Sequence, residues 1–288
     1  MRAAETTFRK PRLRGFTLAE LVIVIALTGI VAAVAATFIV QPIQGYNDLS
    51  NRARLVAQAE TALQKIEYDV HHALPNSIRA NGGAFEMLAV VDGARYRDGP
   101  GGPASDNQPS KRLQFNQADQ EFNILGNFVT LTNGSYPYYI SIYNTGQSGA
   151  DAYSSSGSSG VLAGPGFSIS SDVPTEQHIT LNSAYRFQYQ SPRQRLYVVS
   201  EAIGYLCNGS TITRYNGYNF KDGMSPSAAR FTDGNTGQGL LAENVSNCQI
   251  SYTPGTATRG GIVTIRLGIT DGGETVNLLH QVHVENAP

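Results

Sequence analysis

The sequence is poor in charged residues and in cysteine, and it lacks the short motifs of common catalytic and phosphate-binding sites. Charged residues make up 15% of the chain, a low share that is common among exported proteins. There is no phosphate-cradling glycine loop, nucleophile-elbow serine or metalloprotease helix motif. We therefore expect a protein that is not an enzyme and that carries no cofactor.

The five histidines do not form a metal-binding pattern. His280 and His283 lie on a predicted strand, where an odd separation sends two side chains to opposite faces. His280 falls on the apolar face of that strand, so we expect a core histidine there. His71 and His72 are adjacent on a predicted helix, roughly 100° apart around its axis, which is poor geometry for sharing one ligand. No metal site is predicted.

Residues 92–110 are rich in glycine, proline and aspartate, and this composition predicts a surface loop. Asp92, Asp98 and Asp106 lie in this stretch, but they lack the regular spacing of a calcium-binding loop. We interpret them as solvated acids.

The first 40 residues consist of a basic leader followed by one long apolar run. The run from Phe16 to Val40 spans 25 residues, which as a helix rises roughly 37 Å and is long enough to cross a bilayer. The basic side is expected to stay cytoplasmic, so the chain after Val40 faces outward. The run holds a single carboxylate, Glu20. Its charge costs about 2.5–3.5 kcal/mol in the bilayer, which indicates that it serves a function.

The junction reads Arg14-Gly15-Phe16-Thr17-Leu18-Ala19-Glu20 and resembles the amino terminus of type IV pilins and pseudopilins. The resemblance implies that a prepilin peptidase cuts after Gly15 and methylates the new terminal Phe16. It also implies that Glu20, then the fifth residue, pairs with the terminal amine of a neighbouring subunit. The implied partners are other pilins and minor pilins, the peptidase and an inner-membrane assembly platform. The implied location is a single pass in the inner membrane with a periplasmic domain, followed by an extracellular or periplasmic filament.

Further segments resemble the O-type minor pilin of mannose-sensitive haemagglutinin pilus systems, with the J-type pseudopilin of type II secretion as a near neighbour. These segments are 41–46, 73–77, 251–255, Arg259, 262–264 and 280–284. The resemblance implies a minor subunit in the complex that initiates or caps a filament. Removing residues 1–15 leaves 273 residues, which is larger than the usual major pilin and agrees with a minor role.

Two other interpretations of the leader remain open. A secretory signal peptide also has a basic start and an apolar middle, and Ala33-Val34-Ala35 fits its cleavage site. A plain uncleaved anchor is the second. In either case the protein would be a monomeric periplasmic binding protein or adhesin. The length of the apolar run and the position of Glu20 near its start favour the pilin-like interpretation.

Removal of residues 1–15 changes the net charge from −1 to −5, because 16 basic and 21 acidic residues remain. Binding to nucleic acid needs a basic surface. We therefore do not expect nucleic acid as a partner.

Cys207 and Cys248 are the only cysteines, and both lie far beyond the apolar run. An outward-facing domain lies in an oxidising compartment, so we expect a disulfide between them. On the chain-entropy model, closing this loop of about 40 residues stabilises the fold by about 4 kcal/mol. Two free buried thiols are the alternative.

A helical pattern resumes beyond Pro42, where we expect a kink because proline cannot donate its backbone hydrogen bond. Residues 41–74 are predicted as an amphipathic continuation that packs on a domain. Pro75 is expected to end the helix, because a residue before proline disfavours helical geometry. The apolar stripe of this continuation consists of Leu49, Val56, Ala59, Leu63, Ile66, Val70 and Ala73.

Residues 75–288 predict a β-rich globular domain, since short β-like runs alternate with turn-forming residues. The last two strands form a hairpin with one inward face each, and the tyrosines of 136–139 are expected to fill a sheet face. Residues 154–160 predict a flexible connector and a subdomain break. The predicted strands are 85–91, 112–115, 128–131, 138–143, 185–190, 195–202, 212–215, 248–252, 262–269 and 274–284.

The predicted fold class is therefore α+β, with a long N-terminal helix packed on a domain of antiparallel sheets. Its parts are a cleaved leader (1–15), a transmembrane and assembly helix (16–40), an amphipathic continuation (41–74) and a periplasmic pilin-like domain (75–288).

Overall fold

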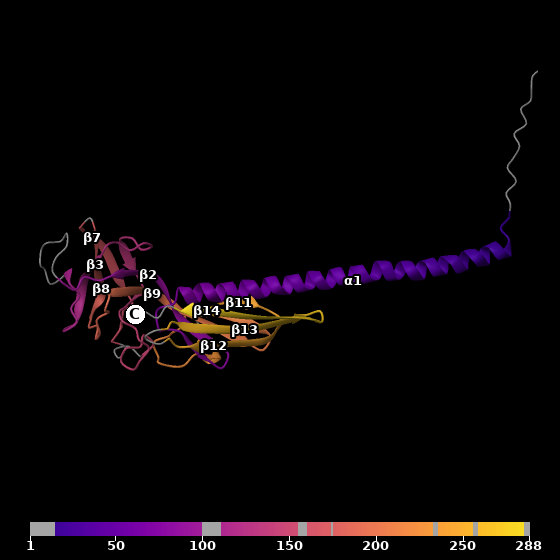
Figure 1. Cartoon of the computed structure of the whole chain (residues 1–288). Coiled ribbons are helices and arrows are strands. Elements are labelled where there is room, and N and C mark those ends of the chain that lie inside the picture. The colour runs from indigo at the N-terminus through magenta and orange to yellow at the C-terminus, as the bar shows by residue number, and fades with distance from the viewer. Residues whose placement is uncertain are drawn as a thin grey trace, which may run out of the picture. The chain divides into compact units, whose positions relative to one another are not determined.

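The computed structural model describes residues 15–99, 111–154, 160–173, 175–232, 236–255 and 259–284. The chain divides into two compact units, Met1–Asn51 and Arg52–Pro288, and the boundary falls inside the long helix α1 (Leu18–His71; Figure 1). The leader up to residue 14, Asp106 and the connector residues 155–159 lie outside the described residues. The predictions made for them therefore stay predictions.

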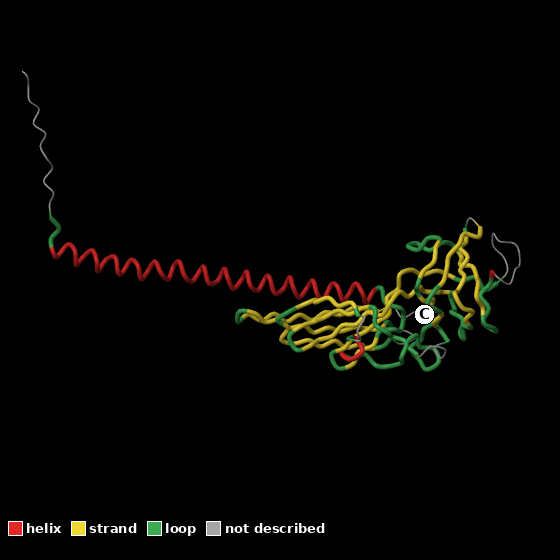
Figure 2. The backbone as a smooth tube through the Cα atoms, turned by 180° about the vertical axis from the view of Figure 1, so that it is seen from behind, coloured by secondary structure: helices red, strands yellow, loops and turns green. Residues whose placement is uncertain are grey.

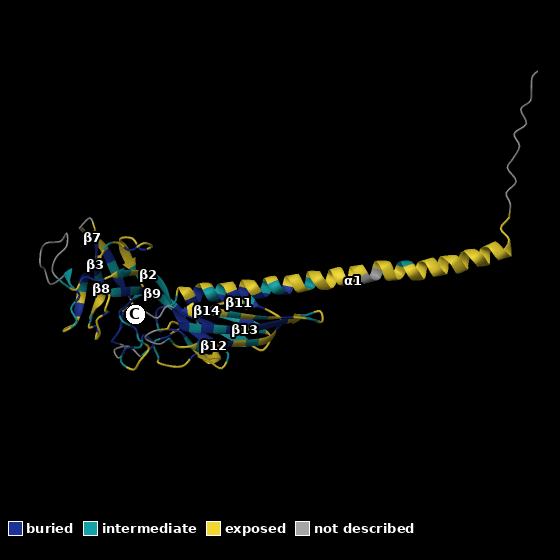
Figure 3. Cartoon of the chain, in the orientation of Figure 1, coloured by how far each residue is buried: buried dark blue, intermediate teal, exposed yellow. Residues whose placement is uncertain are grey.

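In the first unit, the stretch of α1 from Leu21 to Ile39 is apolar around its whole circumference, apart from two threonines. Consecutive residues such as Leu21–Ile25 all expose their side chains, as do most later apolar residues of this unit (yellow in Figure 3). A helix that is apolar all round is suited to lipid or to other helices rather than to water. By length and composition α1 could cross a membrane. It continues on both sides of Pro42, and the predicted kink at that residue stays a prediction.

The second unit packs the remainder of α1 on antiparallel sheets (Figure 2), which confirms the predicted α+β fold class. In the described part of the chain, a seven-stranded sheet has the order β1-β2-β9-β10-β11, with β5 and β6 attached beside β9. Its strands are β1 (Arg79–Asn81), β2 (Ala84–Arg95), β5 (Tyr139–Ser141), β6 (Leu162–Ala163), β9 (Arg195–Asn208), β10 (Thr211–Asn216) and β11 (Gly237–Ala242).

Two smaller sheets complete this unit. The order of one is β12-β13-β14, and the order of the other is β3-β8-β7-β4. A short helix, α2 (Ala228–Phe231), lies between β10 and β11 in sequence. The strands of these sheets are β3 (Asp119–Leu125), β4 (Gly134–Tyr136), β7 (Phe167–Val173), β8 (Glu176–Tyr185), β12 (Val245–Thr253), β13 (Gly261–Asp271) and β14 (Glu274–Val284).

The part of α1 in the second unit is held by one apolar stripe. Predicted members of the stripe at positions 59, 63, 66 and 70 are buried, but Leu49 belongs to the first unit and is 68% exposed. Leu55 and Ala62 extend the stripe instead, and both are fully buried. Burying a leucine, isoleucine or valine side chain contributes about 1.5–3 kcal/mol. The stripe packs against side chains of the seven-stranded and the three-stranded sheets.

α1 ends at His71, three residues before the predicted end at Leu74. Ala73 already forms an antiparallel bridge with Ala89 of β2, and Leu74 N donates to Leu88 O at 2.8 Å. Pairing with the sheet therefore ends the helix earlier than the following proline would.

The C-terminal hairpin agrees with the prediction. β13 and β14 pair from Gly261 opposite Val284 to Asp271 opposite Glu274. The two-residue turn has φ of +59° at Gly272 and +87° at the next glycine, the left-handed geometry that tight hairpins favour. The inward faces that the alternation predicted on both strands contribute to the core.

Two predicted strands, Arg112–Phe115 and Phe128–Leu131, are wrong, because both segments are irregular. A backbone N–H of the first donates to the Asp119 carboxylate. In the second, backbone N–H groups donate to Gln177 and to Asp92. Side-chain acceptors thus replace a neighbouring strand, while both segments still bury apolar side chains.

Other boundaries differ as well. β8 ends at Tyr185, so the predicted strand at 185–190 is wrong, although Phe187 is fully buried. β5 is shorter than the predicted strand 138–143. β2 extends to Arg95, so the predicted loop 92–110 begins later, and Asp92 is buried rather than solvated.

Cys207 of β9 and Cys248 of β12 form a disulfide, with their Cα atoms 5.9 Å apart. Both half-buried residues pack against the core beneath α1. The bond therefore links the seven-stranded sheet to the three-stranded sheet.

Candidate functional site at the start of the long helix

The junction between Gly15 and Phe16 lies in non-helical backbone, two residues before α1 begins at Leu18. Phe16 is 77% exposed, and nothing lies within 4 Å of the position that a Cβ would take on Gly15. Proteases cut at exposed, irregular backbone more readily than inside a helix. Within the part of the chain that the structure describes, this junction is therefore accessible to a peptidase.

Thr17 and Glu20 form a reciprocal cap at the start of α1. Glu20 N donates to Thr17 Oγ1 at 3.2 Å, while Glu20 Oε2 accepts from Thr17 N and from Thr17 Oγ1, both at 3.0 Å. This is the capping box, in which threonine and a glutamate three residues later satisfy each other's backbone donors. Glu20 therefore helps to start the helix within a single chain.

The cap engages only one oxygen of the Glu20 carboxylate. Among the residues that the structure describes, Oε1 accepts no hydrogen bond and no cation pairs with the side chain. An ionised carboxylate offers about four acceptor positions on its two oxygens. Oε1 can therefore accept a hydrogen bond from a donor outside the described chain. The apolar side chains around it are exposed.

The role of Thr17 was not foreseen, although its signal is present in the sequence. The spacing Thr-x-x-Glu before an apolar run is the usual sequence signature of a capping box. Glu20 was expected to act only toward a neighbouring subunit. The structure adds a partner within the chain.

In the second unit, Asp69 of α1 is the centre of one buried ion cluster. Its Oδ2 accepts from Tyr205 at 2.5 Å and from Arg214 at 2.7 Å, and its Oδ1 accepts from Lys65 at 3.0 Å. Burial disfavours the charged form of Asp69, but these hydrogen bonds outweigh it, and the pKa of Asp69 is lowered. The cluster ties α1 to β9 and β10.

Glu86 of β2 is the centre of a second cluster. It is fully buried and pairs with Arg79 and with Arg230, and Tyr218 donates to it at 3.1 Å. Burial raises the pKa of Glu86, and the two guanidinium groups offset part of that effect. Each charge has a partner of opposite sign, so the cluster fixes α2 and the segment before it against β1 and β2.

The histidines do not assemble a metal site. His280 is half-buried rather than in the core, and its Nε2 lies 3.0 Å from Glu67 Oε2. His283 lies exposed on the opposite face of β14, as predicted. In the described ranges, no group of three or more histidine, cysteine, aspartate or glutamate side chains could hold a metal ion.

The clustered tyrosines fill sheet faces, as expected. Tyr136 stacks with Tyr138 at a ring separation of 5.9 Å and lies 5.8 Å from Phe167. Tyr139 meets Phe220 edge-on at 5.3 Å. These rings pack on the apolar clusters of the two sheets that they border.

Comparison with known proteins bears on the N-terminal segment. Residues 10–36 match the family model of the prokaryotic N-terminal methylation motif. This range includes Gly15, Phe16 and Glu20. Comparisons with curated proteins and with solved structures find no match.

The matched motif implies other pilins and a prepilin peptidase as partners in general. The single apolar helix near the N-terminus fits an inner-membrane anchor followed by a C-terminal domain. Motif, helix and β-rich domain together support a type IV pilin-like protein that a prepilin peptidase processes.

Proposed function

We propose that this protein is a minor pilin or pseudopilin that enters a type IV pilus-type filament, in the complex that initiates or caps it. The observation that carries the proposal is Glu20, an ionisable group in the first part of α1, where the neighbouring apolar side chains are exposed. A charge in such a surround is costly unless a partner compensates it. Filament assembly supplies that partner.

The first step is processing. The basic leader holds the precursor in the inner membrane with its β-rich domain outside. Cleavage between Gly15 and Phe16 then creates a new amine on Phe16. The exposed, non-helical backbone at this junction supports the step.

The second step is assembly on an inner-membrane platform. The Phe16 amine of one subunit and the Glu20 carboxylate of its neighbour form an ion pair. Glu20 Oε1 can make this pair because the cap uses only Oε2. Two charges that are costly alone in lipid become tolerable as a pair. Packing between the apolar surfaces of the helices contributes the remaining attraction.

The proposed role is that of a minor subunit and not of an enzyme. A mature chain of 273 residues is bulky for a repeated subunit, whereas one copy in a tip complex has fewer neighbours to accommodate. The segments outside the leader favour the O-type minor pilin of mannose-sensitive haemagglutinin systems, with the J-type pseudopilin as the alternative. The buried ion clusters of the second unit serve its structure and offer no reacting group.

The competing function is a monomeric periplasmic binding protein or adhesin, anchored or released from a signal peptide. Mass spectrometry of the mature N-terminus, on protein from membranes of the native host, separates the two. We expect a chain that begins with N-methylated Phe16. A chain that begins at Ala36, or one with an intact leader, would contradict the proposal.

A further inference from the structure

We propose that an open cavity of the second unit binds an uncharged saccharide. The cavity has a volume of about 800 Å³, within the range of about 300–1,000 Å³ that is usual for small-molecule sites. Its walls are formed by Asp98 after β2, by residues 112–116 before β3 and by Gln190 after β8. The inference rests on this unit and is independent of the proposed function.

Three carboxamide side chains line the cavity, those of Gln114, Asn116 and Gln190. Asn116 and Gln190 are exposed, and within the described part of the chain their side chains have no hydrogen-bond partner. Gln114 Oε1 accepts from Gln117 Nε2 at 2.7 Å, which leaves the NH₂ group of Gln114 for a ligand. A carboxamide both donates and accepts hydrogen bonds, as does a hydroxyl group. The three side chains are therefore suited to a ligand that carries several hydroxyls.

The segment before β3 that lines the cavity is held in place, although it is not a strand. Gln114 N donates to Asp119 Oδ2 at 2.8 Å. Phe115 O accepts from Arg186 Nε at 3.2 Å. The Phe115 ring lies 5.5 Å from the ring of Tyr96, which is fully buried. A site whose walls are fixed beforehand loses less conformational entropy when a ligand binds, so these contacts favour binding.

The lining of the cavity carries no net charge. Its two charged side chains, Asp98 and Arg112, have opposite signs. Asp98 Oδ1 accepts from Gln194 Nε2 at 2.5 Å, and Arg112 is already engaged in an interaction within the chain. Among the described lining residues, a phosphate or a carboxylate would therefore find no cation reserved for it. This lining favours an uncharged ligand.

The apolar part of the lining is small and includes one aromatic ring. Phe115 is half-buried, so part of its ring borders the cavity, whereas Leu113 is 3% exposed. Sites for drug-like molecules and for apolar peptide side chains are lined mostly by apolar residues. Here five of the seven lining side chains are polar. A sugar ring has hydroxyl groups around its edge and an apolar C–H face that can pack on an aromatic ring, so it matches this composition.

The test uses the full chain in a detergent without a sugar head group, such as lauryldimethylamine oxide. Fluorescently labelled protein is applied to an array of neutral and sialylated oligosaccharides, and each bound glycan is then titrated in solution by saturation-transfer NMR. We expect saturable binding of neutral glycans, with no gain in affinity from a sialic acid. N-acetyl-trialanine amide, an uncharged peptide, is titrated in parallel and should not compete with the glycan.

Asn116→Ala and Gln190→Ala should each weaken binding of the neutral glycan about three- to tenfold, because each removes hydrogen bonds to the ligand. Both side chains are exposed and make no hydrogen bond within the described chain, so both variants should unfold at the wild-type temperature. Gln238→Ala truncates an exposed glutamine of β11 outside the cavity and is the matched control, which should bind normally. Binding of no neutral glycan, tighter binding of sialylated glycans or of the peptide, or unchanged binding by both cavity variants would overturn the proposal.

Discussion

Replacing Glu20 with glutamine separates the two roles that the structure gives to this side chain. Glutamine keeps the capping partner of Thr17, because either glutamate or glutamine can occupy that position of a capping box. It cannot form an ion pair with an amine. Two charges 4 Å apart attract by about 4 kcal/mol at an intermediate dielectric constant, and each 1.4 kcal/mol corresponds to a factor of ten. We therefore expect Glu20→Gln to lower incorporation into filaments about a hundredfold or more.

Thr17→Ala is the matched variant, because it removes the cap and leaves the carboxylate in place. Loss of an N-cap costs about 1 kcal/mol of helix stability, so incorporation should fall only a few-fold. Glu20→Ala loses both interactions and should resemble Glu20→Gln in assembly. The loss of incorporation among the three variants should therefore follow the loss of the charge at position 20 and not the loss of the helix cap.

The assay compares the amount of the chain in sheared filaments with the amount that remains in membranes, at equal expression. Mass spectrometry of the membrane fraction checks that each variant is still cut after Gly15, since Glu20 lies inside the helix and not at the junction. Normal incorporation of Glu20→Gln would refute the ion-pair reasoning. Equal losses for Thr17→Ala and Glu20→Gln would show that Glu20 acts through the cap alone.

Two predictions concern the stability of the second unit, measured as the free energy of unfolding of the full chain in detergent. Replacing Cys207 and Cys248 by serine should lower it by about 4 kcal/mol, since the bond closes a loop of 41 residues; a loss below about 1 kcal/mol would contradict this. Asp69→Asn should cost about 3–5 kcal/mol, because it leaves Arg214 without its buried partner. Because the pKa of Asp69 is lowered in the folded state, this side chain stabilises the fold fully at pH values above its unfolded pKa of about 3.9. The stabilisation is lost as the pH falls through the folded pKa. The asparagine variant should therefore lose less stability than the wild type on acidification below about pH 4, whereas Asp98→Asn, at an exposed site, should follow the wild type.

The elements that the sequence predicted well are those whose pattern is set by neighbours close in sequence. The terminal hairpin has strict alternation and a Gly-Gly turn, so its register follows from local geometry. The stripe of α1 has the helical spacing, but both of its ends were misplaced, since Leu49 is exposed and Ala73 lies beyond the end of the helix at His71. Cys207 and Cys248 needed no distance information, because a single pairing was available.

The wrong strands show where local pattern stops being informative. An apolar, β-branched run indicates that side chains are buried, but it does not indicate which partners the backbone N–H and C=O groups hydrogen-bond to. Phe128–Leu131 buries two of its side chains, yet its backbone donors reach Gln177 and Asp92 from other strands. Those acceptors are up to about 50 residues away in sequence, so only the folded chain brings them together.

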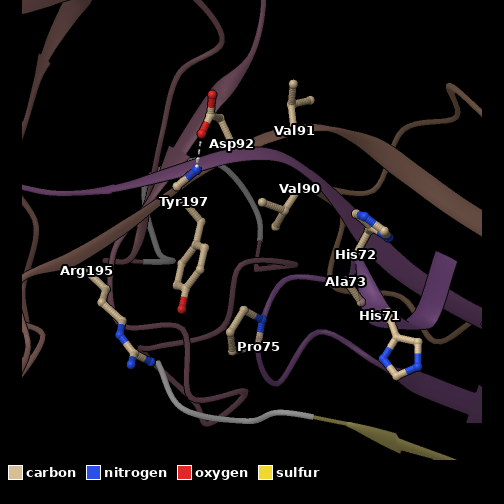
Figure 4. A pocket seen from close by; sticks show the side chains of 10 residues that line it. His71, His72, Ala73, Pro75, Val90, Val91, Asp92, Arg195 and Tyr197 are labelled. Atoms are coloured by element: carbon tan, nitrogen blue, oxygen red, sulfur yellow. Dashed lines mark hydrogen bonds between the residues drawn. The ribbon is translucent and has the colours of Figure 1, made fainter. Parts of the chain in front are cut away.

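The same limit applies to Asp92 itself. Its sequence surroundings of glycine and proline indicate a solvated loop, but three backbone N–H groups from two segments converge on its carboxylate. The acceptor positions of this buried carboxylate are satisfied by these backbone donors, so it does not need contact with water. A cavity of about 270 Å³ beside Asp92 (Figure 4) could not be predicted either, since its walls come from the end of α1, β2 and β9, which are far apart in sequence.

The start of α1 shows how one carboxylate can be tolerated before its final partner exists. A precursor waiting in the membrane has no free amine, because Phe16 is still joined to Gly15. Thr17 then supplies both donors that Oε2 accepts, which reduces the cost of holding Glu20 at this depth without a cation. On the proposed function, cleavage creates the amine, and a neighbour's Phe16 can reach Oε1 while the cap stays in place. The sequence Phe-Thr-Leu-Ala-Glu is thus consistent with a stable monomer and with an assembled filament, and the capping bonds need not be broken between the two.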